Sequence, residues 1–256
     1  MATTQPRANK RAADSFPILE LTLRQFSGGK AVRIVALFAL FPVLFAAIYW
    51  IDSGGITSRE FLDGLYLNLI SATVLPIATL ILATNALGNE IEDRTMVYLV
   101  LKPISRLRIV LEKFVAVVAT ATALLWIGNL LSWLVVLRGD AGDNIDLLVA
   151  IQLSTLIGVL ANAALFLAVS LIVPRALLAG IMYSLLWEST FTRFIPGIRL
   201  MSIRHYVQSI YVRIVDDAQV RVDEAMQLGP AIIVLTIAVV VSLAVATWRL
   251  RTMNLE

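Results

Sequence analysis

Apolar runs long enough to cross a membrane recur along this chain. A membrane-spanning helix needs about 20 predominantly apolar residues, because each residue adds about 1.5 Å toward a hydrocarbon core about 30 Å thick. Since a segment in lipid must satisfy its backbone hydrogen bonds internally, such runs predict helices. The candidate spans cover residues 34–51, 65–87, 114–137, 147–172, 176–192 and 230–248. The sequence therefore predicts an all-α membrane protein with six transmembrane helices.

Composition supports a chain that lies almost entirely in the membrane. Of its 256 residues, 59% are apolar and 15% are charged, whereas soluble domains average about 45–50% and about 25%. Because little chain is left outside the spans, we expect a single transmembrane domain over residues 1–256. The absence of cysteine excludes disulfides, thiolate metal sites and cysteine nucleophiles.

The distribution of basic residues indicates the orientation of the spans. One side of the predicted topology, which includes both termini, holds twice as many lysines and arginines as the other. Positive charge favours the cytoplasmic side, so both termini are expected in the cytoplasm. The basic residues flank apolar runs, and the net charge of +3 therefore reflects membrane topology rather than nucleic-acid binding.

The residues ahead of the first span divide into two parts. Residues 1–14 are expected to form a disordered basic tail. Residues 15–29 predict a short amphipathic helix that begins near Pro17 and ends at Gly28-Gly29, lying at the inner membrane interface. The alternative is an ordinary polar lead-in to the first span.

An outer helical segment is predicted over residues 193–229, before the last span. Within it, residues 199–215 place apolar side chains on one helical stripe, formed by Leu200, Ile203, Val207, Ile210, Tyr211 and Ile214. Such a helix would lie on the membrane or cap the bundle. His205, the sole histidine, is expected on a solvated polar face without a catalytic role.

Residues 88–113 combine acidic, apolar and basic stretches between the second and third spans. The acidic start is followed by an apolar strip, 96–101, that is too short to cross a bilayer. Pro103 removes a backbone donor and predicts a bend, and Ser105 can cap the returning helix. This pattern predicts a cytoplasmic hairpin. One interpretation is a solvated hairpin whose charges set the membrane topology. The other, which the apolar strip favours, is a surface covered by a partner.

Motifs of enzymatic chemistry are absent. The Gly28-Gly29-Lys30 run departs from a phosphate-binding loop, because Arg24 replaces the first glycine and Ala31 lacks a hydroxyl. Candidate substrate-pathway groups at bilayer depth are Asn68, Asn129, Asn162 and Glu188. Amides at such depths also serve as hydrogen-bond partners between helices, and Glu188 could instead pair with Arg193.

One stretch of residues resembles a known family. It consists of Glu90-Ile91-Glu92-Asp93-Arg94-Thr95, then Tyr98-Leu99, then Pro103-Ile104-Ser105-Arg106, and finally Lys113. This stretch resembles the cytoplasmic motif of type 2 ABC-transporter permeases, the six-span membrane subunits of ABC exporters. Arg94 stands where many members have glycine. The order of an interfacial helix, six spans and outer helical material also resembles that family.

The resemblance implies a transport subunit rather than an enzyme. It would pair with a second permease copy or homologue and with cytoplasmic ABC ATPase subunits, which would hold the ATP and Mg²⁺; no cofactor is expected on this chain. The implied ATPase contacts are Glu90, Glu92, Asp93, Arg94, Thr95, Pro103 and Arg106, with Pro174 and Arg175 as a second contact. The expected location is a prokaryotic cytoplasmic membrane.

Two other functions stay open at this point. A polytopic membrane enzyme acting on a lipid would depend on His205 or Glu188, and a membrane scaffold would transport nothing. For an exporter, mostly aliphatic helices are compatible with lipids, hydrophobic drugs or peptides as substrates.

Overall fold

A computed structural model describes residues 16–51, 54–88, 104–139, 142–184, 202–216, 222 and 224–253. In chain order its elements are α1 (Pro17–Gly28), α2 (Lys30–Ala39), α3 (Phe41–Tyr49), α4 (Ser58–Leu65), η2 (Tyr66–Val74), α5 (Leu75–Ala83), η3 (Thr84–Gly88), α8 (Arg106–Leu137), η4 (Gly142–Asn144), α9 (Ile145–Ile172), α10 (Ala176–Met182), α12 (Ile203–Val215) and α13 (Leu228–Thr252). The segments η2 and η3 are π-helical and η4 is a 3-10 turn. Within the described ranges every regular element is helical.

Five continuous stretches are long and apolar enough to cross a membrane. They are Lys30–Tyr49, Ser58–Gly88, Arg106–Leu137, Ile145–Ile172 and Leu228–Thr252. Five of the six predicted spans are thereby confirmed. The remaining one, 176–192, starts as α10 and continues outside the described residues, so it stays a prediction.

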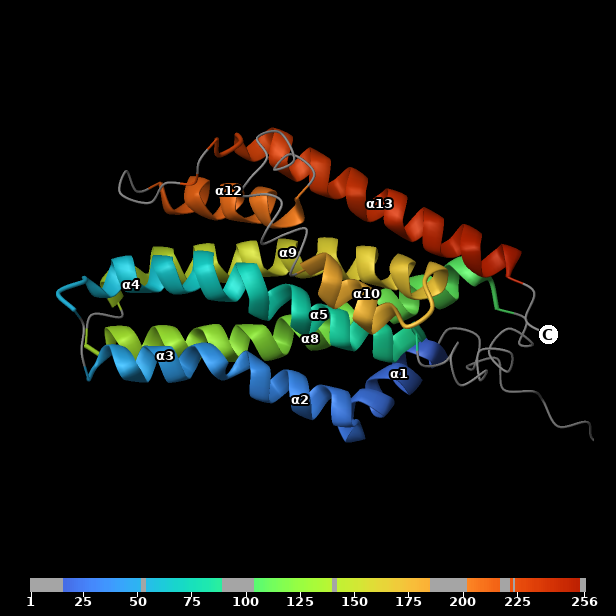
Figure 1. Ribbon diagram of the computed structural model, residues 1–256, viewed down its shortest axis with the longest axis horizontal. Helices are drawn as coiled ribbons and strands as arrows, with labels where there is room; N and C mark the ends of the chain where they lie inside the picture. The colour runs from blue at the N-terminus through green and yellow to red at the C-terminus, as the bar shows by residue number, and fades with distance from the viewer. Residues whose placement is uncertain are drawn as a thin grey trace, which may run out of the picture.

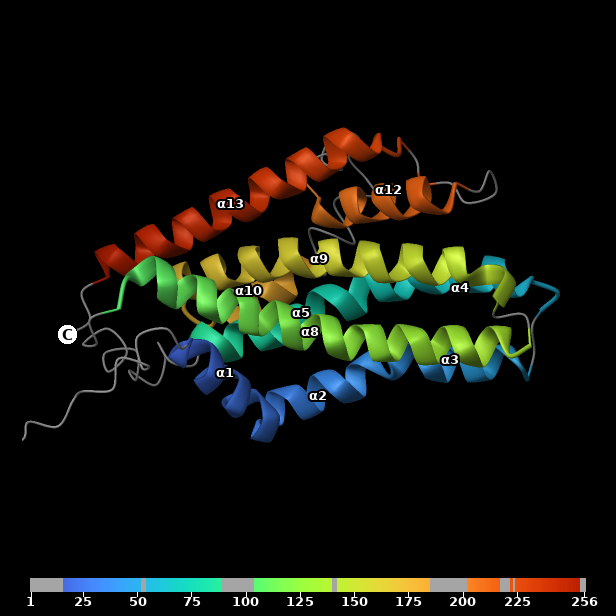
Figure 2. The ribbon, with the colours of Figure 1, turned by 180° about the vertical axis from the view of Figure 1, so that it is seen from behind.

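The spans lie side by side along the long axis of the molecule (Figures 1 and 2). Helix α1, the start of α8 and the last turns of η3, α9 and α13 gather at one end, which we call the α1 end. The opposite end, which we call the α4 end, holds the last turns of α3 and α8 and the first turns of α4 and α9. Helix α1 occupies the stretch where the sequence predicts one, and its place at the membrane interface stays a prediction.

Helix α9 is the centre of the bundle. It contacts α5, α8, α10, α12 and α13, and 67% of its most apolar window is buried, against 11% for α13. Small residues allow this close packing. At Gly158, a Cβ atom would lie 2.8 Å from a methyl carbon of Leu75 and 3.3 Å from Val207, so any larger residue there would require these side chains to move.

The first span is broken where α2 meets α3. Pro42 has no N–H, and its ring crowds the carbonyl four residues earlier, so the chain turns at Leu40 and the Val43 N–H donates to the Leu40 carbonyl. Gly128 of α8 lies against this break. A Cβ atom added to Gly128 would collide with the backbone carbonyl of Ala39. The glycine thus lets α8 touch the broken helix directly.

The second span contains two π-helical segments, which its hydrophobic pattern does not predict. At the end of η2, the Leu75 N–H donates to the Ile70 carbonyl, five residues earlier. The next residue, Pro76, cannot donate to the carbonyl four residues before it. Wider turns ahead of the proline absorb this mismatch, as is typical where a helix is locally disrupted.

Helix α12 confirms the helix predicted from the stripe in 199–215, and it packs against the bundle beside α9, α13 and η2. The expectation that His205 is solvated is wrong, because only 6% of the residue is exposed. Part of the polar face of α12 is buried against polar groups of the second span: Gln208 donates to the Leu67 carbonyl (2.6 Å) and to the Ser71 hydroxyl (3.0 Å). The amphipathic pattern of one helix does not indicate that another helix of the same chain offers polar groups to its polar face.

Candidate functional site

The acidic motif itself lies outside the described residues, but both of its flanks are described. Gly88 precedes it and Ile104 follows it. The predicted contacts Glu90, Glu92, Asp93, Arg94, Thr95 and Pro103, and the pathway candidate Glu188, lie outside the described ranges. We therefore build the site from the residues at the base of the 89–103 segment, on η3, α8 and α1.

Lys113 joins the two flanks of this segment. Its side chain is almost fully buried, at 1% exposed, and the Nζ ammonium donates to the backbone carbonyl of Ala86, 2.6 Å away. The last carbonyls of a helix have no partner within it, and a cation near them is favourable. Because Ala86 precedes the segment and Lys113 follows it, this one contact holds the end of the second span against the start of the third.

Ser105 starts α8 as the sequence predicts. The residue is extended, and its hydroxyl accepts a hydrogen bond from the Arg108 N–H, at 3.4 Å. An N-cap of this type satisfies one of the free donors of the first turn. The returning helix therefore begins at a fixed point, two residues before the first apolar side chain of α8.

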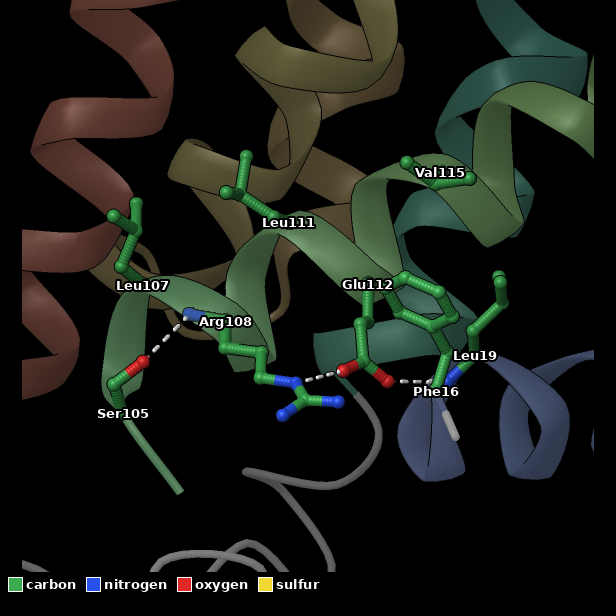
Figure 3. Close-up of a pocket in the computed structure, with 8 residues that line it drawn as sticks. All are labelled: Phe16, Leu19, Ser105, Leu107, Arg108, Leu111, Glu112 and Val115. Atoms are coloured by element: carbon green, nitrogen blue, oxygen red, sulfur yellow. Dashed lines mark hydrogen bonds and ion pairs between the residues drawn. The ribbon is translucent and has the colours of Figure 1, made fainter. Parts of the chain in front are cut away.

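Glu112 connects α8 to α1 (Figure 3). One carboxylate oxygen accepts from the Arg108 Nε at 2.6 Å. The other accepts from the backbone N–H groups of Ile18 and Leu19, both at 2.9 Å. Only 4% of Glu112 is exposed. Sequence reasoning placed this residue inside the predicted hairpin, 88–113, and gave it no role of its own. The start of α1 lacks a capping side chain, and this was the signal that an acceptor had to come from elsewhere.

A pocket of about 520 Å³ lies beside this contact, between α1 and α8 (Figure 3). Its lining is mostly apolar and consists of Phe16, Leu19, Ser105, Leu107, Arg108, Leu111, Glu112 and Val115. The Arg108 guanidinium carbon lies 5.8 Å from the centre of the Phe16 ring, within the range of a cation–π contact. On this side, α1 covers α8 incompletely.

The second predicted contact, Pro174 and Arg175, forms the turn between α9 and α10 at the same α1 end (Figure 1). Both residues are exposed, and Arg175 has a left-handed backbone, with φ 58°. Arg106 is the first residue of α8 and is half-buried. The structure thus places the three described contact candidates at the end that also holds the flanks of the 89–103 segment.

Of the described pathway candidates, one forms a hydrogen bond to a neighbouring helix and two bond to a carbonyl four residues earlier. Asn129 is buried and its amide donates to the Thr155 hydroxyl of α9, at 3.1 Å. Asn162 donates to the Gly158 carbonyl within α9 (2.9 Å), and Asn68 of η2 donates to the Gly64 carbonyl at the end of α4 (3.0 Å). These contacts favour the structural alternative for Asn129, and a pathway role for all three stays a prediction.

Several apolar helices long enough to span a bilayer define a multi-pass helical membrane protein. Two buried charged side chains, Glu112 and Lys113, lie at one end of it. Residues 29–194, well over half of the chain, match the profile of a family described as ABC-2 family transporter protein. The chain therefore belongs to the ABC-2 transporter family and is a membrane permease component of this kind of transporter. A comparison with curated proteins gave no match.

Proposed function

We propose that this chain is the permease subunit of an ATP-driven exporter and that ATP is hydrolysed on a separate cytoplasmic ABC ATPase. The observation that carries the proposal is the bond between Lys113 and Ala86. It closes the base of the 89–103 segment, so that a force applied to the segment acts on the second and third spans together.

The ATPase would dock at two places on the α1 end. One is the 89–103 segment, through Glu90, Glu92, Asp93, Arg94 and Thr95, with Pro103 and Arg106 at its border. The other is the exposed turn at Pro174 and Arg175. Two separated contacts would transmit a rotation as well as a displacement, which a single contact would not.

Transport under this proposal is a shift between two arrangements of the bundle. ATP can drive it only if the docked ATPase binds ATP more tightly in one arrangement than in the other. The ATP and its Mg²⁺ would belong to the partner. A second permease copy or homologue would complete the pathway, and the exposed apolar faces of α3 and α13 are available to lipid or to that copy. The membrane would be a prokaryotic cytoplasmic membrane with both termini inside.

Charge reversal in the acidic motif tests the docking role. The permease is purified with its ATPase, either unchanged or carrying Glu90→Lys and Glu92→Lys. A matched control carries Asp216→Lys and Glu224→Lys, which reverse two exposed negative charges after α12 and before α13, away from the α1 end. The expected result is loss of the bound ATPase, and of its ATP turnover in the complex, only for the first pair.

Unchanged assembly and turnover after the reversal at Glu90 and Glu92 would contradict the proposal. Conversion of a lipid by the isolated chain, lost on changing His205 or Glu188, would favour the membrane enzyme instead. An unaltered distribution of candidate substrates after removal of the protein would favour a scaffold.

A further inference from the structure

The first turn of α1 contains backbone donors that its own sequence does not satisfy. The N-cap residue is Phe16, which offers no side-chain acceptor, and the first N–H groups of a helix have no partner within it. The donors of Ile18 and Leu19 are both taken by Glu112, which lies 94 positions further along the chain. The cap of α1 is therefore supplied by α8.

The burial of Glu112 depends in turn on α1. A carboxylate that is removed from water must be paired and hydrogen-bonded, and here the Arg108 Nε supplies one contact and the first turn of α1 two more. The positive end of the α1 dipole adds a favourable charge at the same place. Helix α1 and Glu112 thus stabilise one another.

Apolar packing alone would not fix how α1 sits on α8. Ile18 and Phe26 are buried in the main core, but this attraction has no preferred direction. Phe16 and Leu19 leave the pocket beside Leu111 unfilled. Hydrogen bonds are directional, so the two N–H contacts to Glu112 determine the register of α1 along α8.

The link from α1 to the first span is short and constrained. Gly29 alone separates α1 from α2, in an extended conformation, and a Cβ there would lie 2.8 Å from the Gln25 carbonyl. A displacement of α1 therefore passes directly to Lys30, the first residue of α2.

We infer that Glu112 is a positioning residue of the transport cycle, holding α1 in register with the first turns of α8 so that the two elements move as one body and carry α2 with them. The inference rests on the proposed function, because it is the docked ATPase that would displace the start of α8. The contacts of Lys113 and Glu112, on adjacent residues, then connect the 89–103 segment to the first three spans.

Spin-label distances test this inference, and the lack of cysteine makes the labels specific. One pair, Leu21→Cys and Ala119→Cys, reports on α1 relative to α8. A second pair, Leu21→Cys and Ile237→Cys, reports on α1 relative to α13. All these positions are exposed. Distances are measured by double electron–electron resonance on the complex with its ATPase in nanodiscs, without nucleotide and with a non-hydrolysable ATP analogue.

In the protein with Glu112 intact, ATP is expected to shift the α1–α13 distance and to leave the α1–α8 distance unchanged. With Glu112→Gln, the α1–α8 distribution should broaden and the ATP-dependent shift of α1 against α13 should be lost, while the ATPase stays bound. The control Glu20→Gln removes a charge from the exposed face of α1, where Glu20 pairs with Arg24, and should leave both distances as they are.

An α1–α8 distance that changes with ATP while Glu112 is intact overturns the inference, and this measurement does not depend on the variant folding. Distances in Glu112→Gln that match the unchanged protein overturn it as well, without affecting the proposed function. If ATP shifts neither pair in the assembled complex, the inference and the proposed function fail together.

Discussion

At the α1 end, adjacent side chains of α8 reach the backbone of two other segments, whereas at the α4 end most polar contacts are local or face solvent. Glu112 and Lys113 are 4% and 1% exposed. At the other end, Thr57 and Glu60 cap α4 reciprocally, and Arg59 pairs with Asp146 at 2.8 Å, with the side chains 30% and 51% exposed.

This difference has energetic consequences. An exposed ion pair contributes about 0–1 kcal/mol, while a buried hydrogen bond to a charged group contributes about 1.5–3 kcal/mol. The α1 end therefore depends on a few specific side chains, and the α4 end on many weak contacts. Under the proposed function, force from the ATPase would enter the bundle at the α1 end, where Glu112 and Lys113 are buried.

The largest effect is expected from Lys113→Met, which keeps an unbranched side chain as far as the ε position and removes the ammonium donor. Loss of the contact to Ala86 should lower the free energy of unfolding by about 1.5–3 kcal/mol, measured by denaturation in detergent. The ATPase should also hydrolyse ATP at the same rate with and without the variant permease. If neither the free energy of unfolding nor the dependence of ATP turnover on the permease changes, the α1 end does not depend on single side chains more than the α4 end does.

A smaller loss is expected from Tyr211→Phe at the α4 end. The Tyr211 hydroxyl donates to the carboxylate of Asp63, and both residues are buried, so this contact departs from the pattern at this end. Leaving that carboxylate without this donor should cost about 1–3 kcal/mol. Binding of the ATPase should be unaffected, and a decrease in binding would mean that the two ends are coupled.

Thr57→Ala removes the side-chain cap of α4. The Thr57 hydroxyl accepts from the Glu60 N–H, and N-cap losses cost about 1 kcal/mol. The matched variant Thr57→Ser keeps the hydroxyl and should restore the stability measured in the same denaturation experiment.

The smallest change is expected from Asp146→Asn. It weakens the exposed pair with Arg59 and should alter stability by less than about 1 kcal/mol, with a further decrease of the effect in high salt. A larger, salt-independent loss would show that the α4 end also relies on single contacts.

Features fixed by neighbouring residues could be predicted from the sequence. Hydropathy located five of the spans, and Pro17, Gly28 and Ser105 marked helix ends, because these signals act within one turn. Contacts between distant segments could not be predicted: Glu112 caps a helix 94 positions away, and Gln208 of α12 donates to a carbonyl of η2. The π-helical segments leave no periodic signal in the sequence.

The length of α8 sets where a partner can meet the chain. Its 32 residues form a rod of about 48 Å at about 1.5 Å per residue, while the hydrocarbon core is about 30 Å thick. An untilted rod of this length would project about 18 Å from the core, and the average tilt of about 20° would reduce this excess by only about 2 Å. If the outer limit of the core lies near Leu137, most of this excess is at the Arg106 end. The third span then continues beyond the head groups as a rigid stalk, on which a water-soluble protein can act without entering the membrane.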